Sequence, residues 1–139
     1  MACPYFYPTE RFVGVTLWPH PARLPLGDGF AGSCSANTGA EFSPDENTLK
    51  ECCNLGYARR CCDRFPEAGA DAVRFTVSSE RDGVIRIWYV LERDHRPYGS
   101  GALEYDREQR VFVAPPEDRV LARQAEVYVE SYLRRTFRL

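Results

Sequence analysis

The sequence lacks the features that would place it in a membrane, in an exported class or in a common enzyme family. It has no apolar run of about 18 residues, the length needed to span a bilayer. Its first residues contain two early prolines, Pro4 and Pro8, and no basic segment, so we expect no signal peptide. It has no H-E-x-x-H, G-x-S-x-G or C-x-x-C motif. We therefore expect a cytoplasmic protein with no membrane partner.

Lysine is almost absent, because Lys50 is the single lysine among 18 basic residues and the others are arginines. The formal net charge is −2 at pH 7, and charges of both signs are mixed along the chain. There is no block of like charge of the kind that forms a tail for nucleic acid or membrane. We therefore expect no nucleic-acid partner.

The composition is that of an ordinary globular protein, with 44% hydrophobic and 27% charged residues. A chain of 139 residues normally forms one domain. We expect a single domain over residues 1–139, with a cysteine-rich metal-binding half at 1–70 and a sheet with a helix at 71–139. The predicted class is α+β: an irregular cysteine-rich N-terminal half with one short helix, packed on an antiparallel meander of about four strands with a long C-terminal helix.

Residues 1–43 are rich in proline and glycine, and only Arg11–Trp18 has the β-branched and aromatic content of a strand. About forty residues of loop are unusual in a compact domain unless something other than a β-ladder holds them in place. Metal bonds can do this, because ligands from distant loops converge on one point. The irregular composition is thus a first reason to expect a metal centre.

A short helix is predicted from Ser43, the expected N-cap, with Pro44 at the first helical position, to about Leu55. On such a helix Cys53 lies on the apolar face. Cys52 lies about 100° away, nearer the polar side. Of this adjacent pair, Cys53 is therefore expected to point inward.

Beyond residue 70 the hydrophobic pattern changes to a period of two, which is typical of strands. Asp82-Gly83 marks a tight hairpin turn. The predicted strands and the final helix cover residues 73–77, Val84–Glu92, Gly99–Tyr105, Arg110–Val113 and Glu117–Arg135. We expect Trp88, in the second of these strands, to lie in the core or under a helix rather than to bind a partner.

All six cysteines lie in the first 62 residues of the chain: Cys3, Cys34, Cys52, Cys53, Cys61 and Cys62. Disulfides are rare in the cytoplasm, so we expect metal ligands or reactive thiols. Because adjacent side chains point apart, each adjacent pair should supply one ligand. The favoured ligands are Cys3, Cys34, Cys53 and Cys62, with Cys52 and Cys61 as alternates.

Four thiolates fit a 4Fe–4S or 2Fe–2S cluster, or a tetrahedral zinc site with four cysteine ligands. Zinc sites usually offer C-x2–4-C knuckles, and none is present. Cys3 precedes a proline, a pairing seen at iron–sulfur ligands, and the small residues beside Cys34 could offer N–H groups to sulfur. We expect an iron–sulfur cluster, with 4Fe–4S favoured and zinc as the alternative. Its expected apolar shell is Tyr5, Phe6, Tyr7, Tyr57 and Phe65.

Outside the cysteines, Asp94-His95 followed by Arg96 is the best polar site, although a hairpin loop explains it equally well. No catalytic residue is assigned, and we lean against a stand-alone enzyme. The expected function is electron transfer or redox sensing through a protein partner. Two alternatives remain, namely a zinc-stapled interaction module and a small thiol-dependent enzyme that uses a vicinal cysteine.

Overall fold

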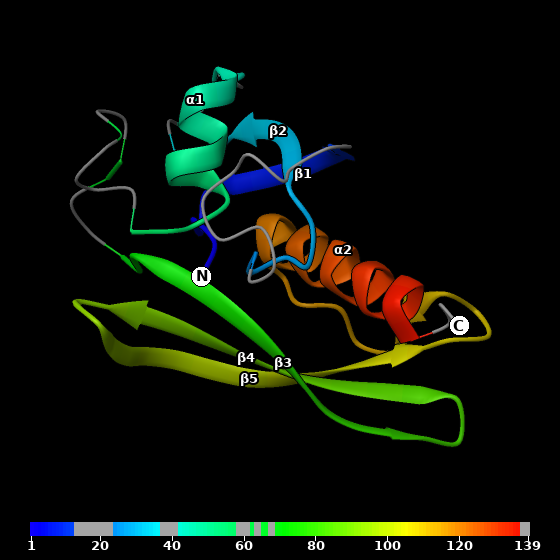
Figure 1. Cartoon of the computed structure of the whole chain (residues 1–139). Helices are drawn as coiled ribbons and strands as arrows, with labels where there is room; N and C mark the ends of the chain where they lie inside the picture. The colour runs from blue at the N-terminus through cyan, green and yellow to red at the C-terminus, as the bar shows by residue number, and fades with distance from the viewer. Residues whose placement is uncertain (13–23, 37–41, 58–61, 63–64, 67–68, 137–139) are drawn as a thin grey trace.

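A computed structural model of the chain describes residues 1–12, 24–36, 42–57, 62, 65–66 and 69–136 (Figure 1). The elements follow in the order β1 (Phe6–Arg11), β2 (Phe30–Cys34), α1 (Glu46–Thr48), the π-helical turn η3 (Leu49–Cys53), β3 (Ala72–Arg81), β4 (Val84–Arg93), β5 (Arg96–Asp106), β6 (Val111–Phe112) and α2 (Arg119–Thr136). The predicted α+β class is confirmed. None of the helices in these described ranges is long and apolar enough to cross a membrane.

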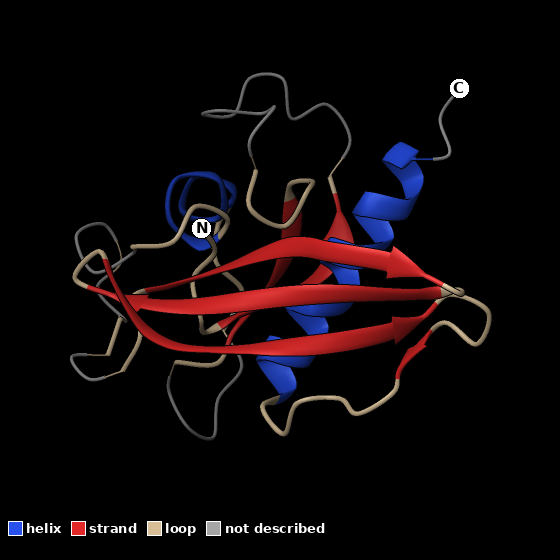
Figure 2. Ribbon diagram, turned by 90° about the horizontal axis from the view of Figure 1, so that it is seen from below, coloured by secondary structure: helices blue, strands red, loops and turns tan. Residues whose placement is uncertain are grey.

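The predicted antiparallel meander is present as a sheet in the order β3-β4-β5-β6. Asp82 and Gly83 form the first hairpin turn with φ of 55° and 77°, the left-handed conformation of a tight two-residue turn. Side chains alternate along the strands, so Ile85 and Ile87 are fully buried on the inner face. Trp88 points the other way and is 43% exposed, which corrects the expectation that it would be covered. Figure 2 shows that no helix of the described residues lies over this outer face.

The N-terminal half is more regular than its composition suggests. β1 and β2 pair as a two-stranded antiparallel sheet, with a register irregularity between Pro8 and Glu10. A proline is tolerated at such an irregularity because no hydrogen bond from its backbone nitrogen is needed there. The expected strand Arg11–Trp18 overlaps β1 only at Arg11, and its residues 13–18 lie outside the described part of the chain.

The short helix begins later than predicted, because Asp45 and not Ser43 is its N-cap. The Asp45 Oδ1 accepts a hydrogen bond from the Thr48 backbone N–H at 2.8 Å. After one α turn the helix widens, and the Asn54 N–H donates to the Leu49 carbonyl five residues back at 3.0 Å. Gly56, with φ of 76°, then ends it.

Helix α2 lies across the inner face of the β3–β6 sheet, with β1 and β2 on its other side (Figure 1). It begins two residues later than predicted because Asp118 caps it, accepting bonds from the N–H groups of Val120 and Leu121 at 2.9 and 3.1 Å. Toward the sheet, the Tyr128 ring packs on Phe75 with centroids 5.4 Å apart. This side of α2 therefore packs on the sheet.

A second buried stripe on α2 faces the N-terminal residues, and it was missed in the sequence. Gln124 and Ser131 are both at most 1% exposed. The Ser131 Oγ donates to the Asp28 Oδ2 at 2.7 Å, and Arg134 pairs with the same carboxylate. With Val120 and Val127, these positions repeat at helical spacing. Helix α2 is thus packed on two sides and joins the two halves of the chain.

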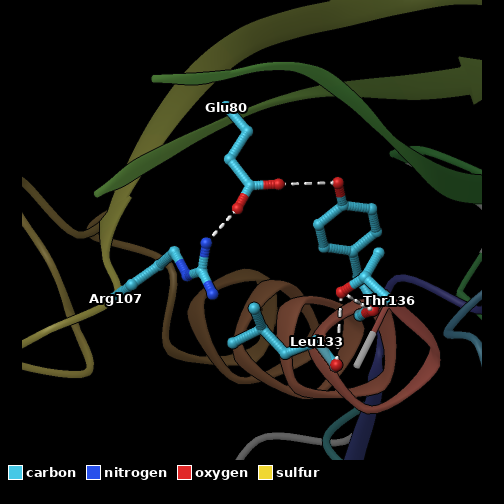
Figure 3. A network of polar contacts seen from close by, with 5 residues as sticks. Glu80, Arg107, Leu133 and Thr136 are labelled. Carbon is cyan, nitrogen blue, oxygen red and sulfur yellow. Dashed lines mark hydrogen bonds and ion pairs between the residues drawn. The ribbon is translucent and has the colours of Figure 1, made fainter. Parts of the chain in front are cut away.

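The far end of α2 is tied to the sheet by a polar network (Figure 3). The Glu80 carboxylate, on β3, accepts a hydrogen bond from the Tyr132 hydroxyl at 2.9 Å and forms an ion pair with Arg107. The Thr136 hydroxyl donates to carbonyls of the preceding turn, including that of Leu133 at 3.2 Å. These contacts hold the last turns of α2 over the β3–β4 hairpin.

The first residues of the chain are fixed to the edge of the main sheet. The Ala2 N–H donates to the Val73 carbonyl at 2.7 Å, and the Val73 N–H donates to the Ala2 carbonyl at 2.8 Å. This bridge extends the sheet beside β3 by one residue pair. Because Cys3 follows directly, it is held at a fixed position relative to both halves.

Candidate metal centre

The four cysteines favoured as ligands line one cavity, which lies between the N-terminal strands and the short helix. About 370 Å³ of its volume is free of atoms, part of it is open to solvent, and little of it is wide enough for a water molecule. The lining residues are Cys3, Tyr5, Phe6, Cys34, Ala36, Phe42, Pro44, Thr48, Cys53, Cys62 and Phe65. Residues separated by up to about sixty positions in the chain therefore meet at one point.

Cys3 and Cys53 form the buried side of this cavity, and each is 6% exposed. The Cys3 N–H donates to the Cys53 carbonyl at 3.0 Å, which joins the N-terminal segment to the last residue of η3. Cys53 thus points inward as predicted from the helix periodicity.

Cys34 reaches the cavity at the end of β2, where it is paired with Phe6 of β1. Its N–H donates to the Phe42 carbonyl at 2.7 Å, and the next residue, Ser35, donates its N–H to the Tyr5 carbonyl at 2.9 Å. The β1–β2 pairing therefore brings Cys34 beside the Cys3 segment. Its side chain is half-buried, so it lies on the more open side of the cavity.

Cys62 is also half-buried and lines the cavity. The Phe65 N–H donates to the Cys62 carbonyl at 3.3 Å. The Phe65 ring in turn packs edge-on against the Tyr5 ring, with centroids 5.5 Å apart. This contact joins the Cys62 segment to the N-terminal segment, and Cys62 is exposed to a similar degree as Cys34. Among the described residues, Cys34 and Cys62 are free thiols, as are Cys3 and Cys53.

Backbone N–H groups favour the charged form of two of the four thiols. The backbone N–H groups of Tyr5 and Phe6 lower the pKa of the Cys3 thiol, against the larger effect of burial. The Ala36 N–H donates to the Cys34 Sγ at 3.4 Å. Such donors stabilise negative charge on sulfur, which is the form that binds a metal.

Burial raises the pKa of the Cys3 thiol to about 12, against the opposing effect of the Tyr5 N–H. The Cys34 and Cys62 thiols raise this pKa further, because a second negative charge nearby is unfavourable. Burial also raises the pKa of Cys53, and the three other thiols act in the same direction. Without a metal both thiols are therefore protonated at neutral pH, and a metal that binds them must displace their protons.

The sequence prediction was wrong about Cys52. It was expected nearer the polar side of the helix, but it is 2% exposed and bonded in a disulfide. Leu49, Cys52, Cys53 and Asn54 are all buried, so this turn is covered on more than one side, whereas the periodicity argument assumed one covered face. In this state Cys52 has no thiolate to offer. The other alternate ligand, Cys61, lies outside the described residues.

The predicted aromatic shell is present in part. Tyr5, Phe6 and Phe65 line the cavity. Tyr7 does not, because its ring lies under the Arg119 guanidinium at 4.3 Å from the ring centroid. Phe42 also lines the cavity, and the sequence analysis missed it. Its position depends on a β-bridge to Cys34, which the sequence does not show. The walls of the cavity are mainly apolar, so they would keep water away from a bound group.

The site does not have the geometry of a single-ion site. In the described part of the chain, no group of three or more His, Cys, Asp or Glu side chains is arranged to hold one metal ion. Thiolates are nevertheless the usual ligands of thiophilic metals, and the four-sulfur donor set fits such a group. In a 4Fe–4S cluster each thiolate binds a different iron, so its ligands are spread more widely than those of one ion.

Asp94 and His95 form the two-residue turn between β4 and β5, with φ of 51° and 62°. The Tyr57 ring stacks on the His95 ring at 4.2 Å, and the Tyr57 hydroxyl accepts a bond from the His95 N–H at 3.0 Å. The same hydroxyl donates to the Glu92 Oε1 at 2.5 Å. Burial, together with the Glu92 carboxylate, raises the pKa of Tyr57 to about 12. These residues therefore bind one another, and the hairpin interpretation accounts for them.

Comparisons of the chain with protein-family models, with curated proteins and with solved structures find no match. The geometry of the cysteine cavity is therefore the basis for assigning a function.

Proposed function

We propose that the protein binds an iron–sulfur cluster, with 4Fe–4S favoured, through the thiolates of Cys3, Cys34, Cys53 and Cys62. The observation that carries this proposal is that these four free thiols, from four separate segments, line one cavity. Four cysteines complete the ligand set of such a cluster. A bound cluster would supply one-electron oxidation and reduction at this position.

The environment of the thiols supports a cluster rather than zinc. Backbone N–H groups are directed at the sulfur atoms of Cys3 and Cys34, and aromatic side chains form much of the wall. Donors to sulfur and burial are the two features by which proteins adjust the potential of iron–sulfur centres.

The two sides of the cavity differ in a way that suits electron transfer to a protein partner. Cys3 and Cys53 are buried, whereas Cys34 and Cys62 are half-buried. A partner in contact with the surface near Cys34 and Cys62 would come closest to the bound group. The proposed role is therefore electron transfer or redox sensing, in the cytoplasm, with a protein partner on that side.

A thiol-dependent enzyme is a weaker interpretation. A nucleophilic cysteine needs a lowered pKa, but burial raises the pKa of both Cys3 and Cys53. Cys52, one of the vicinal cysteines, is bonded in a disulfide. No residue is assigned a catalytic role.

The test is elemental analysis after purification without oxygen or after reconstitution with iron and sulfide. We expect a brown protein with broad visible absorption from thiolate–iron charge transfer and, for the favoured cluster, equal amounts of iron and sulfide at about four each per chain. A colourless protein that contains one equivalent of zinc would refute the cluster and support the zinc-stapled module.

Serine variants test the choice of ligands. Cys3→Ser, Cys34→Ser, Cys53→Ser and Cys62→Ser should each lose most of the iron. Cys52→Ser and Cys61→Ser each change a neighbour of a proposed ligand, and both should retain the iron. Because Cys52→Ser also breaks the disulfide of Cys52, its stability is measured alongside its iron content. Loss of iron in Cys52→Ser and Cys61→Ser alone would show that the ligand was chosen wrongly in each adjacent pair.

A further inference from the structure

A buried glutamine on α2 forms two hydrogen bonds to the segment that carries Cys3. Gln124 is 0% exposed, and its Nε2 donates one hydrogen bond to the Cys3 carbonyl at 2.8 Å and a second to the Phe6 carbonyl at 2.7 Å. Both amide hydrogens are therefore used on backbone atoms more than a hundred positions away in the sequence.

The two carbonyls stand at the ends of one tight turn. The Phe6 N–H donates to the Cys3 carbonyl at 3.1 Å, with Pro4 in the position that favours such a turn. Within the turn, hydrogen bonding by the backbone N–H groups of Tyr5 and Phe6 lowers the pKa of the Cys3 thiol and so favours negative charge on its sulfur. By holding both ends of the turn, Gln124 fixes the orientation of these two donors to sulfur.

The carbonyl end of the Gln124 side chain makes a glutamine unfavourable at this buried position. The Gln124 Oε1 is buried and has no hydrogen-bond partner among the described residues. A buried acceptor without a partner is unfavourable, and an apolar side chain of similar size would avoid this penalty. The two bonds made by Nε2 are the interactions that compensate for it.

We infer that Gln124 is a positioning residue for the metal centre, which sets the lifetime and the reduction potential of the bound cluster through the Cys3–Phe6 turn. This inference rests on the proposed function. Partners that orient a metal ligand from behind commonly change the affinity for the metal by about 10–100-fold when they are replaced. Hydrogen bonds to the ligand sulfur also favour the reduced, more negative form of a cluster.

The test compares Gln124→Met with Val129→Ala in the reconstituted full chain. Methionine keeps the size of the side chain but cannot donate to either carbonyl. We expect the variant to release iron to a chelator about 10–100-fold faster than the wild type, and its reduction potential to become more negative. Val129 is equally buried on the same helix and has no polar side-chain atom, so Val129→Ala reports the effect of a weakened α2 alone.

Gln124→His is a partial rescue, because the imidazole Nε2–H lies close to the position of the amide nitrogen and can still donate one bond. Its iron release should be intermediate, and it also replaces Gln124→Met if that variant does not fold. Equal release rates and equal potentials for Gln124→Met and Val129→Ala would overturn the inference.

Failure of the proposed function has a separate signature. If the wild type takes up no iron and sulfide, the cluster proposal fails, and the positioning role is judged on the metal-free chain by hydrogen exchange. The backbone amides of Tyr5 and Phe6 should then exchange faster in Gln124→Met than in Val129→Ala. Equal exchange at these amides would refute the positioning role in either case.

Discussion

The two halves of the molecule are stabilised in different ways. The half from β3 to α2 has three long antiparallel strands and a buried apolar face that includes Ile85 and Ile87, and it contains no cysteine. The half before it has one short strand pair, a helix of little more than two turns and a cavity lined by four thiols. The two halves share one hydrophobic core, but long strand ladders also hold the sheet half together, whereas the cysteine half has one short strand pair among its described residues and surrounds the cavity of the proposed cluster.

The largest expected effect lies in the sheet half. Ile87→Ala should lower the free energy of unfolding by about 2–5 kcal/mol, because it leaves a cavity in a close-packed core. Urea denaturation should show the same decrease in the free energy of unfolding, relative to the wild type, with and without the proposed cluster. Val113→Ala, at a residue that is 63% exposed, is the control and should change the stability by about 0.5 kcal/mol or less. A loss that appears only in the loaded protein would show that the halves are not independent.

Removal of the cluster should affect the cysteine half selectively. A group present at a free concentration of 100 times its dissociation constant stabilises the structure that binds it by about 2.7 kcal/mol. This corresponds to hydrogen exchange that is about 100-fold slower. We therefore expect amides of β1, β2 and η3 to exchange about 100-fold faster in the metal-free protein. The amides of β4, at the centre of the sheet, should not change. Uniform acceleration across both halves would contradict the distinction.

Alkaline pH should destabilise the metal-free protein. The pKa of Cys3 is about 12 in the folded chain and 9.0 when the thiol is unperturbed. Between these values the unfolded chain loses the thiol proton while the folded chain keeps it, so stability is full below about pH 9 and falls as the pH rises. The expected slope is about 1.4 kcal/mol per pH unit for this group, measured by denaturation at several pH values. Cys3→Ser should have a smaller slope, and an unchanged slope would show that Cys3 is not the cause.

The smallest expected effect comes from the two helix caps. Asp45→Ala and Asp118→Ala each remove an N-cap that accepts backbone N–H bonds, and the loss of the Asp118 cap should cost about 1 kcal/mol. Asp118→Ala should lower the global stability, because α2 packs on both halves. Asp45→Ala should instead speed hydrogen exchange in α1 and η3 and leave the denaturation midpoint almost unchanged. Equal shifts of the midpoint would mean that the short helix belongs to the same cooperative unit as the sheet.

Much of the sheet half could be predicted because its signals are local. Alternating side chains and the Asp82-Gly83 turn identify β3 and β4 directly. The second hairpin has a weaker signal, since its turn uses Asp94 and His95 in left-handed conformations without a glycine. That turn is held by Tyr57, which is distant in sequence, so local propensity could not predict it.

In the cysteine half, the choice of four sulfurs followed from spacing and helix periodicity, and the structure places these four around one cavity. The burial of Cys52 could not be predicted in this way, because the periodicity argument assumed an α-helix and the chain forms a π-helical turn there. The β1–β2 pairing was also missed, since the strand contains Pro8 and its partner is more than twenty residues away. Gln124 had no signal at all, because its role depends on a contact across the whole fold.

That contact also has a consequence for biosynthesis. Cys3 is made before Gln124, the residue that holds its turn, and 121 positions separate them in the sequence. At about 5–20 residues per second, this interval lasts roughly 6–24 s. During that time the nascent chain presents its cysteines before the helix that orders the first of them exists. If the protein binds the proposed cluster, the complete site is therefore available only after α2 has been made.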